Sequence, residues 1–219
     1  MTKSAFSPSR TFLYACAVVG VGNLLWADEG FGVRCLEHLQ ARFCPPADTV
    51  LVDGGTLGLG LLETFTTSRD VLILDCADLH APPGTLLVLE GASITPWATT
   101  RLSAHQGGVA EVLAAAALLG QSPERIAVVA VQPQVLEDYG GSLSDVVRTQ
   151  LHPAVDAALR VLVAWGHPFT PRALQSPLQP MPTFTAPALS VRRYEAERPS
   201  AEEACRTGDP RFAYSSGDL

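Results

Sequence analysis

Basic residues are scarce in this sequence of 219 residues, which contains one lysine, Lys3, and has a formal net charge of −7. A nucleic-acid-binding protein needs a basic excess to neutralise phosphates, so that class is excluded. No apolar run reaches the length that a membrane span requires. Because 47% of the residues are hydrophobic and 17% are charged, the composition is typical of a globular protein. We therefore expect one well-buried domain with no nucleic-acid partner and no insertion into a membrane.

The five cysteines are odd in number and lack the CxxC spacing of structural zinc sites. We therefore expect reduced thiols in a cytoplasmic protein instead of a disulfide framework.

The apolar stretch at 12–20 follows Lys3 and Arg10 like the core of a signal peptide, but it runs into a glycine turn and is typical of a buried strand. Serine hydrolase chemistry is not indicated, because no GxSxG motif occurs. Cys76 follows Asp75 in an apolar run, which favours a structural thiol with a raised pKa.

Apolar runs alternate with helical patterns along the central part of the chain. The runs predicted to be strands cover residues 12–20, 48–53, 70–75, 85–90 and 125–133. Helices are predicted over residues 30–43, 57–65, 106–120 and 142–166, the last one interrupted or kinked at Pro153. Strands that are apolar throughout and alternate with helices form sheets that are buried on both faces. The sequence therefore predicts a three-layer α/β/α fold with a mostly parallel, twisted sheet of about five strands.

The two ends of the chain differ from this central part. Residues 1–11 are predicted to be a flexible leader, and residues 12–166 to form a single α/β domain. Residues 167–219 are rich in proline and have no sustained apolar period. We expect this segment to be a largely disordered extension, with a short helix around 194–205.

Acidic side chains follow three of the predicted strands near the point where each strand ends. The candidate site residues are Asp28 and Glu29 after the first strand, Asp53 at the end of the second, Asp75 at the end of the third, and His105 before a later helix. Because the loops after parallel strands meet at one edge of a sheet, we expect these groups to converge. Carboxylates that lie close together raise one another's pKa unless a cation lies between them. Mixed carboxylate and imidazole ligands suit zinc, nickel or iron, although Asp53 and Asp75 could instead cap turns.

The stretch "VVGVGNLLWADEGFG" at 18–32 also imitates a dinucleotide-binding loop, with Asp53 placed like a ribose-binding acid. Two features oppose this interpretation. The position of the third glycine is occupied by Leu25, whose bulk would hinder packing of the helix on the strand. The acidic pair that follows would repel a pyrophosphate. We therefore expect a cation at this loop, and no nucleotide or other organic cofactor.

The motifs "GVGNLLWADEGFGVR", "DGGTLGL", "LILDCAD" and "SAHQGGVAEVL", in this order and spacing, resemble those of the [NiFe]-hydrogenase maturation endopeptidases, in the branch that serves uptake hydrogenases. The resemblance covers residues 15–165. It implies a hydrolase, often classed as an aspartic protease, that removes a C-terminal peptide from the large-subunit precursor of a [NiFe] hydrogenase. It also implies a metal site of Glu29, Asp75 and His105 at one edge of a five-stranded sheet, and it links Asp53 to function. The metal is expected to be the nickel of the substrate, so that only a loaded precursor is cut.

Two mechanisms stay open at this point. The metal polarises the scissile carbonyl or activates water, or the nickel is only a recognition handle and Asp53 or Asp28 is the general base. A metal-sensing chaperone that docks on the hydrogenase precursor without cutting it is the alternative function. A monomer is expected, because the substrate must reach a sheet edge.

Overall fold

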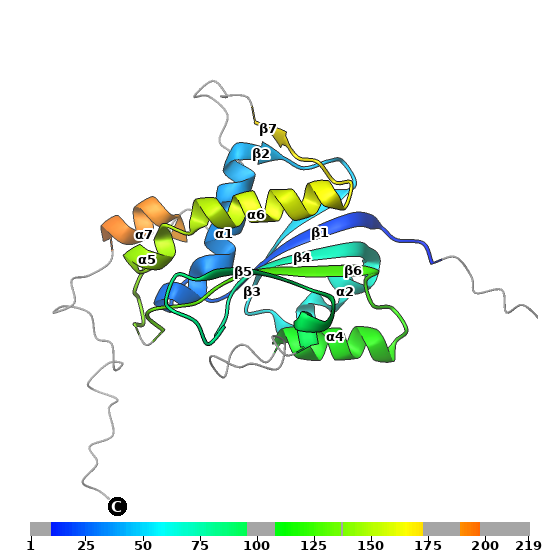
Figure 1. Cartoon of the computed structure of the whole chain (residues 1–219), viewed down its shortest axis with the longest axis horizontal. Helices are drawn as coiled ribbons and strands as arrows, with labels where there is room; N and C mark the ends of the chain where they lie inside the picture. The colour runs from blue at the N-terminus through cyan, green and yellow to red at the C-terminus, as the bar shows by residue number, and fades with distance from the viewer. Residues whose placement is uncertain (1–9, 96–107, 137, 173–188, 198–219) are drawn as a thin grey trace, which may run out of the picture.

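The computed structural model describes residues 10–95, 108–136, 138–172 and 189–197. Its main sheet contains the strands β1 (Tyr14–Val21), β3 (Thr49–Gly55), β4 (Ser68–Cys76), β5 (Leu86–Glu90) and β6 (Arg125–Val131). Their order is β3-β1-β4-β6-β5, and helices lie over both faces (Figure 1). The predicted three-layer α/β/α fold is confirmed.

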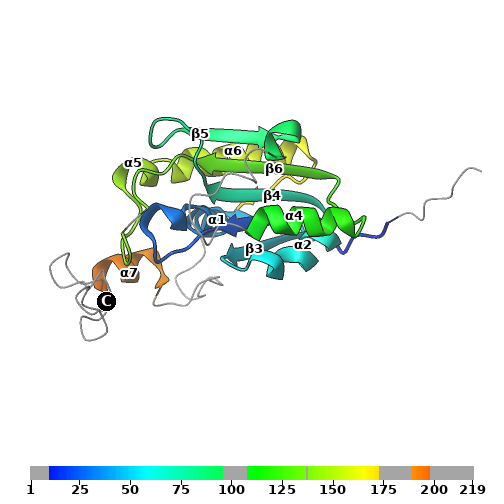
Figure 2. The ribbon, with the colours of Figure 1, turned by 90° about the horizontal axis from the view of Figure 1, so that it is seen from below.

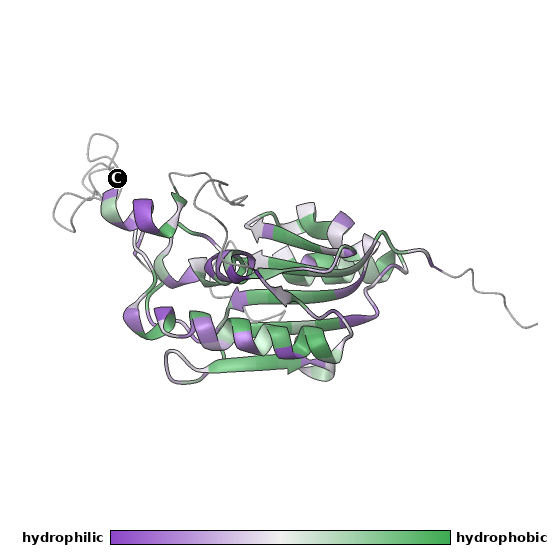
Figure 3. Ribbon diagram, turned by 90° about the horizontal axis from the view of Figure 1, so that it is seen from above, coloured by the Kyte–Doolittle hydropathy of each residue, from purple (hydrophilic) through white to green (hydrophobic). Residues whose placement is uncertain are grey.

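Parallel pairing joins β3, β1, β4 and β6, whereas β5 runs antiparallel to β6 at one edge. The three inner strands consist mainly of buried apolar residues, visible as green ribbon in Figure 3, as expected for strands that are covered on both faces. In β5, Leu87 and Val88 are exposed. The five predicted strands are confirmed, and the antiparallel strand is the one at the partly exposed edge.

Helices α1 (Phe31–Arg42) and α6 (Leu151–Ala164) cover one face of the sheet, and α2 (Leu62–Thr67) and α4 (Gly108–Leu118) cover the other (Figure 2). Each face has its own core, with the fully buried side chain of Phe31 in one and that of Phe65 in the other. Burial of such a side chain stabilises the fold by about 1.5–3 kcal/mol. Two short 3₁₀ segments, η1 (Ala27–Gly30) and η2 (Gly58–Leu61), precede α1 and α2, and a third, η3 (Gly91–Ser93), follows β5. Among the described residues, no helix combines the length and the apolar character that crossing a membrane requires.

The helix predicted over residues 142–166 is divided in the structure. A single turn, α5 (Asp145–Arg148), is followed by α6. Pro153 is the third residue of α6 and lies in its first turn, where a backbone N–H has no partner inside the helix. The predicted break at Pro153 is therefore wrong, because α6 begins two residues before the proline and continues through it.

The folded unit continues past residue 166, where the predicted domain ends. His167 is buried, and its Nε2 lies 2.7 Å from Oδ2 of Asp70. A two-residue strand, β7 (Thr170–Pro171), pairs antiparallel with β2 (Phe43–Cys44). These contacts attach at least the first residues after 166 to the domain.

A last helix, α7 (Val191–Glu197), overlaps the start of the helix predicted at 194–205. It lies beside α5 (Figure 1), and Glu195 forms an ion pair of 2.6 Å with Arg148. Residues 1–9, 173–188 and 198–219 lie outside the described part of the chain, so the flexible leader and the disordered extension stay predictions.

Candidate active site

A glycine turn brings the first acidic pair to the edge of the sheet. Gly22 follows β1 and has a φ of +133°, a conformation that L-residues rarely adopt. A Cβ at this position would lie 1.8 Å from the backbone oxygen of Glu29. Only glycine therefore lets the chain fold back so that η1, which carries Asp28 and Glu29, lies against the end of β1.

A second glycine, Gly32, lets α1 pack closely on the sheet. A Cβ at this position would lie 2.1 Å from the backbone oxygen of Leu74 and 2.3 Å from that of Val21. Dinucleotide-binding folds use their third glycine for the same close packing, but here it stands seven residues after Leu25. The available signal in the sequence was a glycine inside a helical pattern, where it costs stability and can have a packing reason.

Glu29 and Asp75 are both buried at this edge, where only 4% and 6% of each residue is exposed. Burial raises the pKa of Asp75 to about 8; the backbone N–H of Cys76, 2.8 Å from Oδ1, opposes this shift and the charge of Glu29 adds to it. No cationic side chain of the described residues contributes to the pKa of Asp75. Two of the three predicted ligands therefore share one buried acidic location, which a cation would stabilise.

His105, the third predicted ligand, lies outside the described residues. The helix that follows it, α4, begins at Gly108, and a Cβ there would lie 2.4 Å from Cα of Gly58. The start of α4 thus packs on the loop that follows Asp53 and β3. Within the described ranges, no three His, Cys, Asp or Glu side chains form a metal-binding group, so the complete set of three ligands stays a prediction.

Asp53, one of the two candidate general bases, lies two residues before the end of β3 and has a half-buried side chain. Its Oδ1 accepts a hydrogen bond of 3.0 Å from the backbone N–H of Gly55. Burial raises the pKa of Asp53 above its ordinary value, although the hydrogen bond from Gly55 acts in the opposite direction. This carboxylate therefore has a turn-capping contact and also retains access to solvent.

Asp28, the other candidate base, is completely buried. Its carboxylate accepts hydrogen bonds of 2.7–2.9 Å from the backbone N–H groups of Gln134, Val135 and Ser144 and from the hydroxyl of Ser144. The side chain thus ties η1 to the segment that connects β6 and α5. Local sequence patterns gave no signal for these contacts, because the partners lie more than 100 residues away.

Cys76, next to Asp75, is a buried thiol whose pKa is raised well above the ordinary value by burial and then by the neighbouring carboxylates. A thiolate nucleophile is therefore disfavoured at this position. The expectation of a structural thiol agrees with these surroundings.

Comparison with known proteins identifies the family of this chain. The family model for hydrogenase maturation proteases matches residues 33–161, which is more than half of the chain. The chain belongs to the hydrogenase maturation proteases. As a member of this family it is a hydrolase, an endopeptidase that acts in hydrogenase maturation, which confirms the resemblance seen in its motifs.

Individual relatives support this membership over most of the chain. The hydrogenase expression/formation protein HoxM of Cupriavidus necator is 45% identical over 89% of this chain and 96% of its own length. HupD of Rhodobacter capsulatus is 41% identical over 98% of both chains. The solved structure of the hydrogenase-maturating endopeptidase HybD of Escherichia coli has 34% identity and a TM-score of 0.68, over 72% of this chain and 97% of that one.

Proposed function

We propose that this maturation protease removes a C-terminal peptide from the nickel-loaded large-subunit precursor of a [NiFe] hydrogenase. Glu29, Asp75 and His105 recognise the nickel that the substrate carries. The observation that supports this proposal best is the buried carboxyl group of Asp75, which lies beside Glu29 and whose pKa is raised to about 8. A divalent cation is the simplest partner for such a pair.

The chemistry of the donor set fits nickel. Two carboxylates and one imidazole are ligands that suit a borderline divalent metal. Three protein ligands also leave coordination positions for groups that the substrate supplies. In this proposal nickel belongs to the substrate and works as a recognition handle, so that an unloaded precursor binds weakly and is not cut.

Asp53 is the general base in this proposal. Its half-buried carboxylate can reach solvent, and a pKa above the ordinary value brings an acid closer to the working range of a base near neutral pH. It accepts a proton from the water that attacks the scissile carbonyl carbon, and the proton then moves to the amine when the C–N bond breaks. Asp28 has a positioning role, because its four hydrogen bonds use both carboxylate oxygens.

The test is incubation of the protein with nickel-loaded precursor, followed by measurement of the precursor mass. Wild-type protein and the exposed control Glu63→Gln on α2 should shorten the precursor, whereas Glu29→Gln, Asp75→Asn and His105→Ala should not. Asp53→Asn should bind the loaded precursor without cutting it. An intact precursor in a stable complex with the wild-type protein would support the non-cleaving chaperone instead and overturn the proposal. Monomeric state and cytoplasmic location stay predictions.

A further inference from the structure

We propose that five exposed apolar side chains around the carboxylate site form a docking surface for the folded precursor, a proposal that rests on the function proposed above. These residues, here called the docking rim, lie on loops or 3₁₀ turns that follow parallel strands, and each is between 37% and 59% exposed. They are Leu25 after β1, Leu57 and Leu59 after β3, and Val135 and Tyr139 after β6.

All three segments lie at one edge of the sheet, because β1, β3 and β6 are parallel in the same sheet and their carboxyl ends meet there. In Figure 2 the same edge carries the start of α1, where the acidic pair lies. The docking rim and the carboxylates of Glu29 and Asp75 therefore belong to the same end of the molecule.

Backbone hydrogen bonds hold the three loops together. The N–H of Gly22 donates to the carbonyl of Gly55 at 3.0 Å, which joins the loops after β1 and β3. The N–H of Gly140 donates to the carbonyl of Leu25 at 2.7 Å, and the rings of Trp26 and Tyr139 pack edge to face at 5.4 Å between centroids. The rim is thus fixed before any partner arrives, which lowers the conformational entropy lost on binding.

The burial of the carboxylates explains why a substrate must contact these loops. Glu29 and Asp75 expose only 4% and 6%, so a metal ion that is held by another protein can reach them only if that protein lies against the surrounding loops. Exposed apolar side chains that gather on one surface mark interaction sites, and tyrosine is a frequent hot-spot residue at protein interfaces. A folded protein with an apolar surface around its metal is the partner that this chemistry fits.

A second copy of this chain fits the rim less well. Two-fold contact between identical rims would bring the acidic groups of both copies face to face. The chain has a net charge of −7, and Glu29, Asp53 and Asp75 lie at this edge. Carboxylates that face other carboxylates across an interface repel each other. A metal-bearing partner supplies the opposite charge.

The experiment compares the double variant Leu57→Ser/Tyr139→Ser with the control Leu118→Ser/Val163→Ser, whose two residues are more exposed than any of the rim and lie outside it, on α4 and α6. Cleavage of nickel-loaded precursor is measured over a range of precursor concentrations. The rim variant should raise KM by about tenfold or more, the usual effect of losing an interface hot spot, with kcat little changed. The control should leave both constants within about twofold, because isolated surface substitutions have small effects.

The outcomes separate the rim from the proposed function. If wild-type protein cuts the precursor and the rim variant has the same KM as the control, the docking surface is wrong and the proposed function stands. If wild-type protein cuts nothing, the proposed function fails, and a binding measurement with the same precursor still tests the rim. A concentration-dependent dimer that the rim variant abolishes, or a KM that falls in this variant because a segment of the chain itself covered the rim, would also overturn the proposal.

Discussion

Strand β4 carries two buried aspartates, Asp70 near its start and Asp75 near its end, and their pKa values are shifted in opposite directions. The two residues lie at opposite ends of this central strand, Asp70 where the parallel strands begin and Asp75 where they end. Both are buried in a low-dielectric interior, where an ionised carboxylate is costly without a partner. What differs between them is the set of neighbours.

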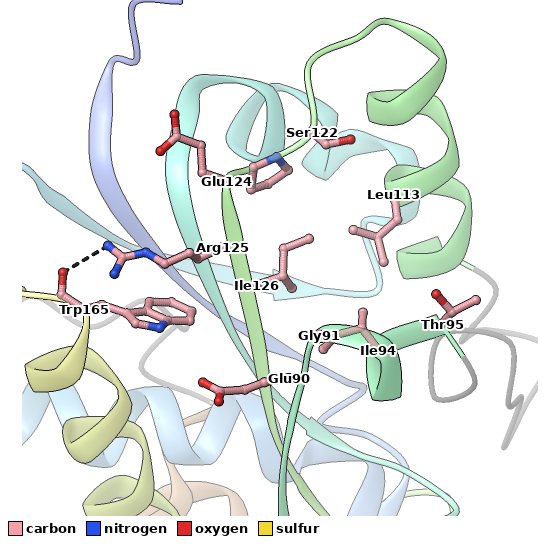
Figure 4. Close-up of a pocket in the computed structure, with 11 residues that line it drawn as sticks. Glu90, Gly91, Ile94, Thr95, Leu113, Ser122, Glu124, Arg125, Ile126 and Trp165 are labelled. Carbon is pink, nitrogen blue, oxygen red and sulfur yellow. Dashed lines mark hydrogen bonds between the residues drawn. The ribbon is translucent and has the colours of Figure 1, made fainter.

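Asp70 is surrounded by hydrogen-bond donors that stabilise its charge. Arg125 donates from Nε and Nη2 at 2.7 and 2.5 Å, and Nε2 of His167 lies 2.7 Å from Oδ2. Arg125 also donates to the carbonyl of Trp165, beside a cavity of about 570 Å³ (Figure 4). Burial alone would raise the pKa of Asp70, but the hydrogen bonds from Arg125 and His167 outweigh it, so that the pKa lies below its ordinary value.

Among the described residues, Asp75 accepts a hydrogen bond from the backbone N–H of Cys76, and the charge of its acidic neighbour Glu29 raises its pKa further. The comparison shows that two buried acids on one strand can have opposite pKa shifts, depending on whether cationic side chains lie beside them. The first has its countercharge within the chain. For the second, Asp75, no described cationic side chain lowers the pKa, and this raised pKa is what the proposed role in binding the nickel of the substrate would require.

The largest effect on stability should follow from removing the charge of Asp70. We expect Asp70→Asn to lower the free energy of unfolding by about 3 kcal/mol, because a buried ion pair is broken while Arg125 stays in place. The stabilisation that Asp70 provides is present above its unfolded pKa near 4 and is lost as the pH falls through its lower folded value. Urea unfolding at pH 7 and at acidic pH measures both effects. Asp156→Asn, on the exposed side of α6, is the matched control and should change little.

Asp75→Asn should change the free energy of unfolding in the opposite direction, stabilising the metal-free protein at high pH. Because the pKa of Asp75 is 3.8 in the reference state and about 8 in the folded protein, folding binds a proton between these values, and stability falls as the pH rises from about 4 to about 8. The variant lacks this loss, so at pH 9 we expect it to be more stable than the wild type, while the two should agree near pH 4.

The same variant tests whether nickel binds at Asp75, because the melting temperature can be measured with and without nickel. Ligand that binds only the folded state raises the melting temperature. Nickel should therefore stabilise the wild-type protein at pH 8 and leave Asp75→Asn unchanged. Equal shifts in both proteins would show that nickel binds elsewhere, and a variant less stable than the wild type at pH 9 would show that the charge of Asp75 is already compensated.

Much of the fold was predictable because its signals are local. Uninterrupted apolar runs marked each strand of the main sheet, and the parallel arrangement placed Glu29, Asp53 and Asp75 at one edge. The division between α5 and α6 was not visible, because Val147 and Leu151 continue the apolar spacing across the break and both are buried. Periodicity reports which residues face the core, and it does not report where the backbone leaves the helix.

The parts of the site that escaped prediction depend on partners far apart in the sequence. Asp28 looked like a candidate base, yet it is bound by Ser144, which is 116 residues away. No local sequence pattern indicated the contact between Asp70 and His167, which are 97 residues apart. Such contacts arise only when packing brings segments together, so residue type and local spacing cannot specify them. His105 lies outside the described residues and its role stays a prediction.

The smallest effect should come from a third kind of acid, which has an arginine partner but lies at the surface. Glu195 of α7 pairs with Arg148 at 2.6 Å and accepts a hydrogen bond from Ser142, also at 2.6 Å. Both charged side chains are about one-third exposed, so solvent screens the pair, and Glu195→Gln should lower the free energy of unfolding by less than about 1 kcal/mol. The consequence should instead be local, because Ser142 stands two residues before Ser144, which holds Asp28.

Hydrogen exchange measures this local effect. Amides of residues 138–148 should exchange faster in Glu195→Gln than in the wild type, and added salt should reduce the difference by weakening the wild-type pair. The control is Glu197→Gln, whose partner Arg193 lies within the same helix, so that its loss cannot release the loop. Equal exchange in the two variants would mean that α7 does not hold this loop. Faster exchange only with Glu195→Gln would show that an ion pair too weak to stabilise the whole fold can still order the segment beside the site.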